Sequence, residues 1–258
     1  ILFMYILINY IDIIYKMYNA YNTKDVKKKL PPPVFNPNLK THKIKMNSHW
    51  LLCGPTGAGK TNAVWSYLGQ MDNCFSHIYV FTNDSDEPIY NALRDKLGEH
   101  ITFQSISKVP TTKQFKDDKV EGEVLIIFDD FICEGKHTIE RLTSYAIQMR
   151  KQNCTCMYLT QSFFSCPPKL RGQISYLALL SMTDKKNVSL IASSLATSIE
   201  LPVVKHIMQN ATKEALNVCI INLKSCPLNE KFRRNFLDFY TVVDDDGNEL
   251  PISRIPLY

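Results

Sequence analysis

Residues 54–61 read Gly54-Pro55-Thr56-Gly57-Ala58-Gly59-Lys60-Thr61 and directly follow the apolar run Trp50-Leu51-Leu52-Cys53. The eight residues match the phosphate-binding pattern G-x-x-x-x-G-K-[ST] in full, and that pattern requires a strand before the loop and a helix after it. The apolar run predicts the strand, and the helix is expected from about Lys60 to Gln70. The alternative is a glycine-rich turn without phosphate, but chance produces this pattern in roughly one chain in a hundred of this length. We therefore predict that the chain binds a nucleotide at this loop.

The residue types of the loop suit a di- or triphosphate. Its three glycines allow φ values that a side chain would oppose, so that successive backbone N–H groups point inward at the phosphates. The N-terminal end of the following helix adds positive charge. Lys60 is predicted to reach the β- and γ-phosphates, and the Thr61 hydroxyl is predicted to be a Mg²⁺ ligand. The expected cofactors are ATP and Mg²⁺.

Length and composition set the class of protein. A chain of 258 residues can bury one substantial core, and 45% hydrophobic with 21% charged residues is typical of soluble globular proteins. The net charge of +5 permits a polyanionic partner without requiring one. The eight cysteines include no C-x-x-C pair, which favours reduced thiols in an intracellular protein over a zinc site.

Residues 1–45 are predicted to form an N-terminal extension and a basic, proline-rich arm. The apolar residues 1–15 contain Asn9 and Asp12 and are shorter than the ~20 residues of a spanning helix, so no stable membrane anchor is expected. Residues 1–16 are interpreted as sequence upstream of the real start or as a disordered or interfacial extension. Lys27–Lys29 and Pro31–Pro33 predict an extended segment, for which a solvated tail and a contact with nucleic acid or a neighbouring subunit are equally good interpretations.

Strands and helices alternate along residues 46–224, which predicts a three-layer α/β domain with a mainly parallel central sheet, the P-loop NTPase class. Residues 225–258 are assigned to a C-terminal tail. Besides the first strand, strands are expected at 77–81, 101–103, 124–128, 154–159, 174–182 and 218–223. Further helices are expected at 88–97, 137–151, 185–195 and 202–216.

The buried strand 124–128 ends in Asp129-Asp130, where ligands bind in open α/β sheets. Asp129 is predicted to hold Mg²⁺ through water in the Walker-B position. Asp130 is the candidate to orient or deprotonate the attacking water, with a structural or helix-capping carboxylate as the alternative and Glu134 as the reserve base. Gln161 follows the next strand and is a candidate to contact the γ-phosphate or that water, although a strand-end residue without such a role fits equally well.

Arginines are the candidates to neutralise charge in the transition state. Arg141, Arg150 and Arg171 are considered for this role, and each alone also fits a surface arginine. In the tail, Lys231, Arg233 and Arg234 are candidates to contact a nucleic acid backbone.

These blocks together resemble the DNA-packaging ATPases of poxviruses, other large DNA viruses and virophages, a branch of the FtsK/HerA superfamily. The resemblance covers about residues 46–240 and rests on residues 54–61, 77–86 and 125–130, on Arg150 with Leu159-Thr160-Gln161, and on Leu170-Arg171-Gly172. It implies a homo-oligomeric ring motor that uses ATP to drive double-stranded DNA into a preformed viral capsid at a portal or vertex. It also implies a location at virus assembly sites in the host-cell cytoplasm or in the virion. Superfamily members commonly have Glu where this chain has Asp130, and either Arg150 or Arg171 could act across subunits.

Two other functions fit the loop alone. One is a P-loop kinase of a nucleotide or small molecule, which would want an arginine-rich lid that no compact segment here resembles. The other is a nucleotide-dependent assembly or binding module that hydrolyses poorly. ATP turnover with and without duplex DNA distinguishes the three.

Overall fold

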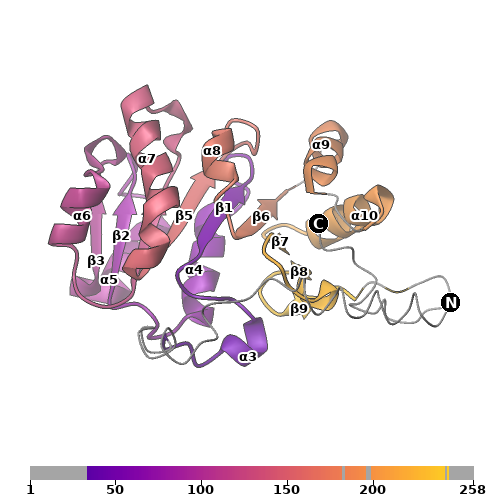
Figure 1. The fold of residues 1–258 in the computed structure, drawn as a ribbon, viewed down its shortest axis with the longest axis horizontal. Coiled ribbons are helices and arrows are strands. Elements are labelled where there is room, and N and C mark those ends of the chain that lie inside the picture. The colour runs from indigo at the N-terminus through magenta and orange to yellow at the C-terminus, as the bar shows by residue number, and fades with distance from the viewer. Residues whose placement is uncertain (1–33, 182–183, 196–198, 242, 244–258) are drawn as a thin grey trace, which may run out of the picture. The chain divides into compact units, whose positions relative to one another are not determined.

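The computed structural model describes residues 34–181, 184–195, 199–241 and 243. Its central element is a sheet whose strands lie in the order β3-β2-β4-β5-β1-β6-β7-β8-β9 (Figure 1). The strands are β1 (His49–Cys53), β2 (His77–Phe81), β3 (Ile101–Gln104), β4 (Val124–Phe128), β5 (Cys154–Thr160), β6 (Tyr176–Leu180), β7 (Val218–Asn222), β8 (Phe232–Arg234) and β9 (Asp238–Phe239). The α-helices are α3 (Leu39–His42), α4 (Lys60–Gln70), α5 (Pro88–Leu97), α6 (Thr112–Asp118), α7 (Lys136–Gln148), α8 (Pro168–Arg171), α9 (Lys185–Leu195) and α10 (Leu201–Ala211).

The sheet is parallel from β3 to β6, and antiparallel pairing begins with β7. Cys53 of β1 is in register with Thr160 of β5, and Phe128 of β4 is in register with Tyr158 of β5. The loops that leave β1, β4 and β5 therefore lie at one edge of the sheet. The predicted three-layer α/β class with a mainly parallel sheet is confirmed.

Helices cover both faces of the sheet, which explains why strands such as β4 are continuous apolar runs. On one face, α4 and α5 pack through residues such as Tyr67 and Leu93. On the other face lie α6, α7, α8, α9 and α10, and Phe128 stacks against Tyr158 with ring centroids 5.1 Å apart. Aromatic packing thus stiffens the strands that carry the predicted site.

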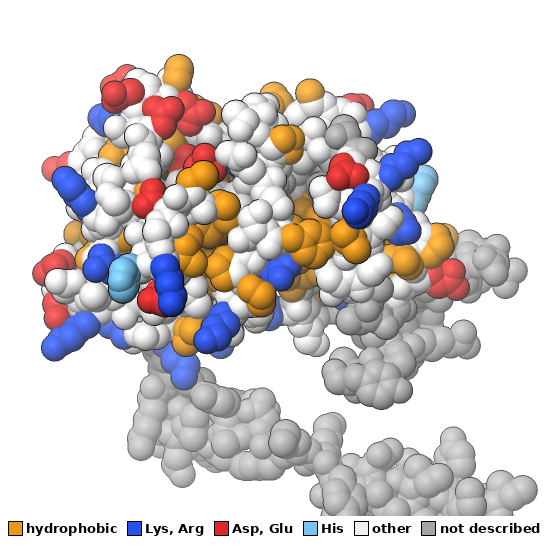
Figure 2. All heavy atoms as spheres, turned by 90° about the horizontal axis from the view of Figure 1, so that it is seen from above, with side chains coloured by type: hydrophobic (Ala, Val, Ile, Leu, Met, Phe, Trp, Pro, Cys, Tyr) orange, Lys and Arg blue, Asp and Glu red, His pale blue; other side chains and the backbone are white. Residues whose placement is uncertain are grey.

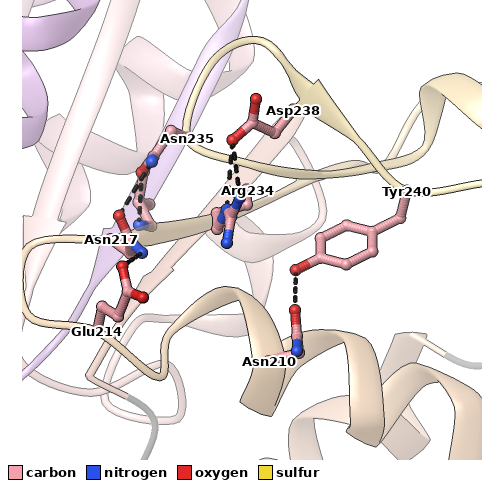
Figure 3. Close-up of polar contacts among 8 residues, drawn as sticks. Asn210, Glu214, Asn217, Arg234, Asn235, Asp238 and Tyr240 are labelled. Carbon is pink, nitrogen blue, oxygen red and sulfur yellow. Dashed lines mark hydrogen bonds and ion pairs between the residues drawn. The ribbon is translucent and has the colours of Figure 1, made fainter.

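The C-terminal part of the sheet differs from the prediction. Strands β8 and β9 continue the sheet beyond residue 224, where the sequence analysis ended the core. Figure 3 shows how the hairpin is held: the Arg234 guanidinium pairs with Asp238 at 3.2 Å, and the Tyr240 hydroxyl donates to Asn210 of α10 at 2.7 Å. Strand β8 reads Phe-Arg-Arg and strand β9 reads Asp-Phe, so neither has the longer apolar run that predicts the other strands.

The predicted DNA-contacting cluster in this hairpin is wrong for Arg233. Its side chain is fully buried, packs over the Phe239 ring at 4.6 Å and donates to the His42 carbonyl oxygen. The alternation of side chains along β8 directs this arginine inward. Because its guanidinium is buried, it cannot reach a DNA backbone.

Two further boundaries differ. The helix predicted for 202–216 ends at Ala211, where the Thr212 hydroxyl donates back to the Met208 carbonyl oxygen. The helix predicted for 137–151 ends at Gln148 and continues as the 3₁₀ turn η5 (Met149–Gln152). Residues 1–33 of the predicted extension and arm, with Lys27–Lys29 and Pro31–Pro33, lie outside the described residues. Residues 34–45 are described; they include α3 and the buried His42 and Ile44, so this part packs on the core and is not a free arm. Of the helices within the described ranges, none has both the length and the hydropathy to cross a membrane.

Candidate nucleotide site

A cavity of about 610 Å³ opens at the carboxyl edge of the parallel strands. It is lined by the phosphate loop, the segment between β2 and α5, and the ends of β4 and β5. Figure 2 views this edge from above and shows acidic side chains (red) gathered over one part of it. The cavity brings together six residues predicted from sequence: Lys60, Thr61, Asp129, Asp130, Glu134 and Gln161.

The phosphate loop has the backbone that its glycines predict. Gly57 and Gly59 have φ of 76° and 94°, in the left-handed region that favours glycine. A Cβ on Gly54 would lie 2.9 Å from the Leu180 Cβ, so that position has no room for a side chain. The Gly54 N–H donates to the Thr160 carbonyl oxygen at 3.1 Å and fixes the loop to β5.

The loop residues fit a bound triphosphate. No side chain caps the N-terminus of α4, which leaves the first N–H groups of the helix available to an anion. Lys60 Nζ donates to the carbonyl oxygens of Gly54 at 3.0 Å and Pro55 at 3.2 Å. The ammonium is therefore held beside the cradle by contacts that a phosphate oxygen can replace. Pro55, Thr56 and Ala58 complete the turn, in which the Ala58 N–H donates to the Pro55 carbonyl oxygen at 3.2 Å.

Both predicted Mg²⁺ ligands are held by partners from the start of α5. The Thr61 hydroxyl donates to Glu87 Oε2 at 3.2 Å, and the Tyr90 hydroxyl donates to Asp129 Oδ2 at 2.6 Å. Burial raises the pKa of Asp129, and the Tyr90 hydrogen bond opposes that shift. The oxygen-only donors Thr61 and Asp129 suit Mg²⁺, which commonly takes one or two protein ligands and completes its shell with phosphate and water.

Asp130 and Gln161 form a pair at the ends of adjacent strands. Gln161 Nε2 donates to both carboxylate oxygens of Asp130, each at 3.2 Å. Asp130 has φ of 48°, and it makes no side-chain cap to the following turn η4 (Phe131–Cys133), so the helix-capping interpretation finds no support. Glu134 accepts a hydrogen bond from Asn83 Nδ2 at 2.8 Å and also lines the cavity. Asp130 and Glu134 therefore both stay candidates for the base.

The structure does not bring the three arginines into this cavity. Arg141 donates to the Val109 carbonyl oxygen at 2.8 Å. Arg150 lies in η5, just before β5 begins, and therefore at the amino edge of the sheet, opposite the phosphate loop. Arg171 lies over the rings of Phe163 and Phe164, at 4.9 and 5.5 Å, beside a separate cavity of about 530 Å³. Within this chain, neither Arg150 nor Arg171 lines the nucleotide cavity.

Glu87 and Tyr90 were missed by the sequence analysis. The buried residues of α5 are Tyr90 and Leu93. Tyr90 could have been found from its three-residue spacing to Leu93. The hydrogen bonds to Thr61 and Asp129 join residues far apart in sequence, and no local pattern marks them.

Comparison with known proteins gives one family and a set of similar folds. The family described as Poxvirus A32 protein matches residues 37–234. The genome packaging NTPase B204 from Sulfolobus turreted icosahedral virus 2, solved in complex with sulfate, aligns with a TM-score of 0.51 and 13% identity over 74% of this chain and 97% of that chain. The DNA-packaging ATPase B204 from Sulfolobus Turreted Icosahedral Virus aligns with a TM-score of 0.49 and 13% identity over 74% of this chain and 98% of that chain. Comparison with curated proteins gave no match. At these identities, the alignment above 0.5 shows a shared fold.

Proposed function

Because this chain belongs to the poxvirus A32 protein family, we propose that it is the ATPase that moves double-stranded DNA into a preformed viral capsid. The observation that carries the proposal is the extent of the family match, which runs from residue 37 to residue 234 and includes the whole nucleotide cavity. The chain is a P-loop ATPase of this family. The similar fold with a TM-score of 0.51 belongs to a protein described as a genome packaging NTPase, and we propose the same kind of activity for this chain.

The residues of the cavity divide the chemistry among them. The backbone N–H groups of the phosphate loop and Lys60 hold the β- and γ-phosphates once the Lys60 ammonium leaves the loop carbonyls. When bound through Thr61 and Asp129, Mg²⁺ supplies positive charge to the phosphate oxygens. Asp130 orients and deprotonates the attacking water, and Gln161 holds the Asp130 carboxylate in place.

Charge neutralisation by arginine requires a second subunit in this proposal. Arg150 and Arg171 lie outside the cavity of their own chain, so one of them serves the ATP of a neighbour in a homo-oligomeric ring. Such a ring encircles the DNA and docks on a portal or vertex of the capsid, at virus assembly sites in the host-cell cytoplasm.

The test is ATP turnover by the full chain with and without duplex DNA, with Lys60→Ala as the inactive control. Turnover that DNA stimulates, together with ring-sized particles in the presence of a non-hydrolysable ATP analogue, is expected. A phosphorylated small-molecule product would instead identify a kinase. Nucleotide binding without turnover would identify an assembly or binding module.

A further inference from the structure

One short segment touches both of the groups that fit Mg²⁺. Glu87 accepts the Thr61 hydroxyl hydrogen at 3.2 Å, and Tyr90, three residues later, donates to Asp129 at 2.6 Å. Both Glu87 and Tyr90 belong to the first turn of α5, which is not part of the phosphate loop or of β4. The start of α5 therefore forms a second layer of contacts behind the metal site.

The Glu87 side chain is directed at Thr61 and not at its own helix. Glu87 occupies the N-cap position of α5 but makes no side-chain cap hydrogen bond, although N-cap side chains commonly bond the first turn. Its backbone carbonyl oxygen accepts the N–H groups of Tyr90 at 2.9 Å and Asn91 at 3.1 Å, so the backbone alone begins the helix. The carboxylate lines the nucleotide cavity.

The loop that carries Glu87 is fixed before any ligand arrives. Asn91 Nδ2 donates to the Asp86 carbonyl oxygen at 3.0 Å, and Arg94 donates to the Ser85 carbonyl oxygen at 3.2 Å. The Arg94 guanidinium in turn lies over the Phe103 ring at 4.5 Å. These contacts hold the segment without help from Thr61, so the Glu87 carboxylate is available to orient the Thr61 hydroxyl.

Hydrogen-bond chemistry explains why a metal ligand needs this partner. A threonine hydroxyl has one hydrogen to donate and two lone pairs. When Thr61 gives its hydrogen to Glu87, the lone pairs remain free for a cation. Asp129 is arranged in the same way, because Tyr90 occupies Oδ2 and leaves Oδ1 for the ion or its water.

We propose that Glu87 is a positioning residue for the metal ion, which it serves by orienting the Thr61 hydroxyl and by adding negative charge to the site. The inference rests on the proposed ATPase function and deepens it. Outer partners of metal ligands typically change metal affinity by about 10- to 100-fold when they are removed. A carboxylate beside a triphosphate is also repulsive until a cation is present.

The test measures binding of a non-hydrolysable ATP analogue to the full chain, in EDTA and in Mg²⁺, for wild type, Glu87→Gln and Glu87→Ala. The affinity gained on adding Mg²⁺ is expected to fall about 10-fold in Glu87→Ala, whereas affinity in EDTA is no weaker than in wild type. Glu87→Gln keeps an oxygen acceptor for Thr61, so its gain in affinity on adding Mg²⁺ is expected to lie between those of wild type and Glu87→Ala. Mn²⁺ binding in the presence of the analogue, followed by electron paramagnetic resonance, gives a readout independent of hydrolysis.

The matched control is Asp95→Ala, an exposed carboxylate on the same helix, with thermal midpoints to verify folding. If Glu87→Ala loses the same factor of analogue affinity in EDTA and in Mg²⁺, Glu87 only maintains the loop. If the variant binds the analogue as wild type does in both conditions, Glu87 has no role. Either result overturns the inference. The proposed function fails separately, if wild type binds the Mg²⁺ complex but shows no DNA-stimulated turnover.

Discussion

Replacing Gly54 by alanine is expected to disable the phosphate loop through contact with β6. The added Cβ would lie 2.9 Å from the Leu180 Cβ, 3.1 Å from the Leu180 carbonyl oxygen and 3.2 Å from the Ala58 Cβ. Carbon atoms pack best at about 3.5–4.0 Å, so the loop must move away from β6 by roughly 0.6–1 Å. The three opposing atoms are one backbone oxygen and two Cβ atoms, which cannot turn aside as the end of a side chain can.

The size of that shift sets the expected losses. Overpacking of this kind costs about 1–3 kcal/mol of unfolding free energy. A misplacement of about 1 Å in a catalytic site costs on the order of 100-fold in rate. We therefore expect Gly54→Ala to lose on the order of 100-fold in ATP turnover and about 1–3 kcal/mol in unfolding free energy, measured by steady-state ATP hydrolysis and by urea unfolding.

The control uses a glycine in the same loop with a different physical role. A Cβ on Gly57 would meet no atom within 4 Å, and only its φ of 76° opposes a side chain, which costs about 1–2 kcal/mol. Gly57→Ala should therefore retain more activity than Gly54→Ala. Leu180→Ala keeps its Cβ and should not rescue Gly54→Ala. Normal turnover in Gly54→Ala, or a larger loss in Gly57→Ala, would refute the reasoning.

Three substitutions in the site and one change of pH give further tests. Asp129→Asn should weaken Mg²⁺-dependent ATP binding, whereas Asp130→Asn should keep binding and slow hydrolysis; normal hydrolysis in Asp130→Asn would assign the base elsewhere. Tyr90→Phe removes the donor to Asp129 and should reduce Mg²⁺-dependent ATP affinity by about 10-fold without loss of the fold, as read by isothermal titration and circular dichroism. Burial, with the positive charges of Arg150 and Lys224, lowers the pKa of His49 to about 4. Because the unfolded chain takes up a proton at His49 near pH 6.5 and the folded chain does not until about pH 4, stability should fall by up to about 3 kcal/mol as pH drops through this window. Urea unfolding at pH 7 and pH 4.5 measures the fall, and an equal fall in His49→Gln would exclude this histidine as its source.

The parallel half of the fold could be predicted because its strands are apolar runs closed by polar residues. The run 124–128 followed by Asp129 is one such case, and the structure places its strand where the pattern does. Strands β8 and β9 have three and two residues and could not be recognised in this way. The pairing of β8 with β7 on one side and β9 on the other accompanies the burial of Arg233, and that is a tertiary effect without a local sequence signal.

The candidate site likewise has residues that the sequence predicts and contacts that it does not. The motif located Lys60, Thr61 and Asp129, since spacing in the sequence reflects the chemistry of the phosphate loop and of the strand end. The contacts of Glu87 with Thr61 and of Tyr90 with Asp129 span 26 and 39 residues, so they depend on how α5 packs against the sheet. By contrast, Arg150 comes before strand β5 and Gln161 comes after it, so the sequence already places the two at opposite edges of the sheet.

The pairing of strand β5 on both sides has a mechanical consequence. Its seven residues, about 23 Å at the rise of a strand, join the turn that carries Arg150 to Gln161 at the nucleotide cavity. It is paired on both sides, with β4 and with β1, so it cannot slide without breaking two hydrogen-bonded ladders. A slip of one residue would also turn its buried side chains to the wrong face. Force applied at one end of this strand is therefore transmitted to the other end by tilting of the sheet as a rigid plate, with little stretching along the way.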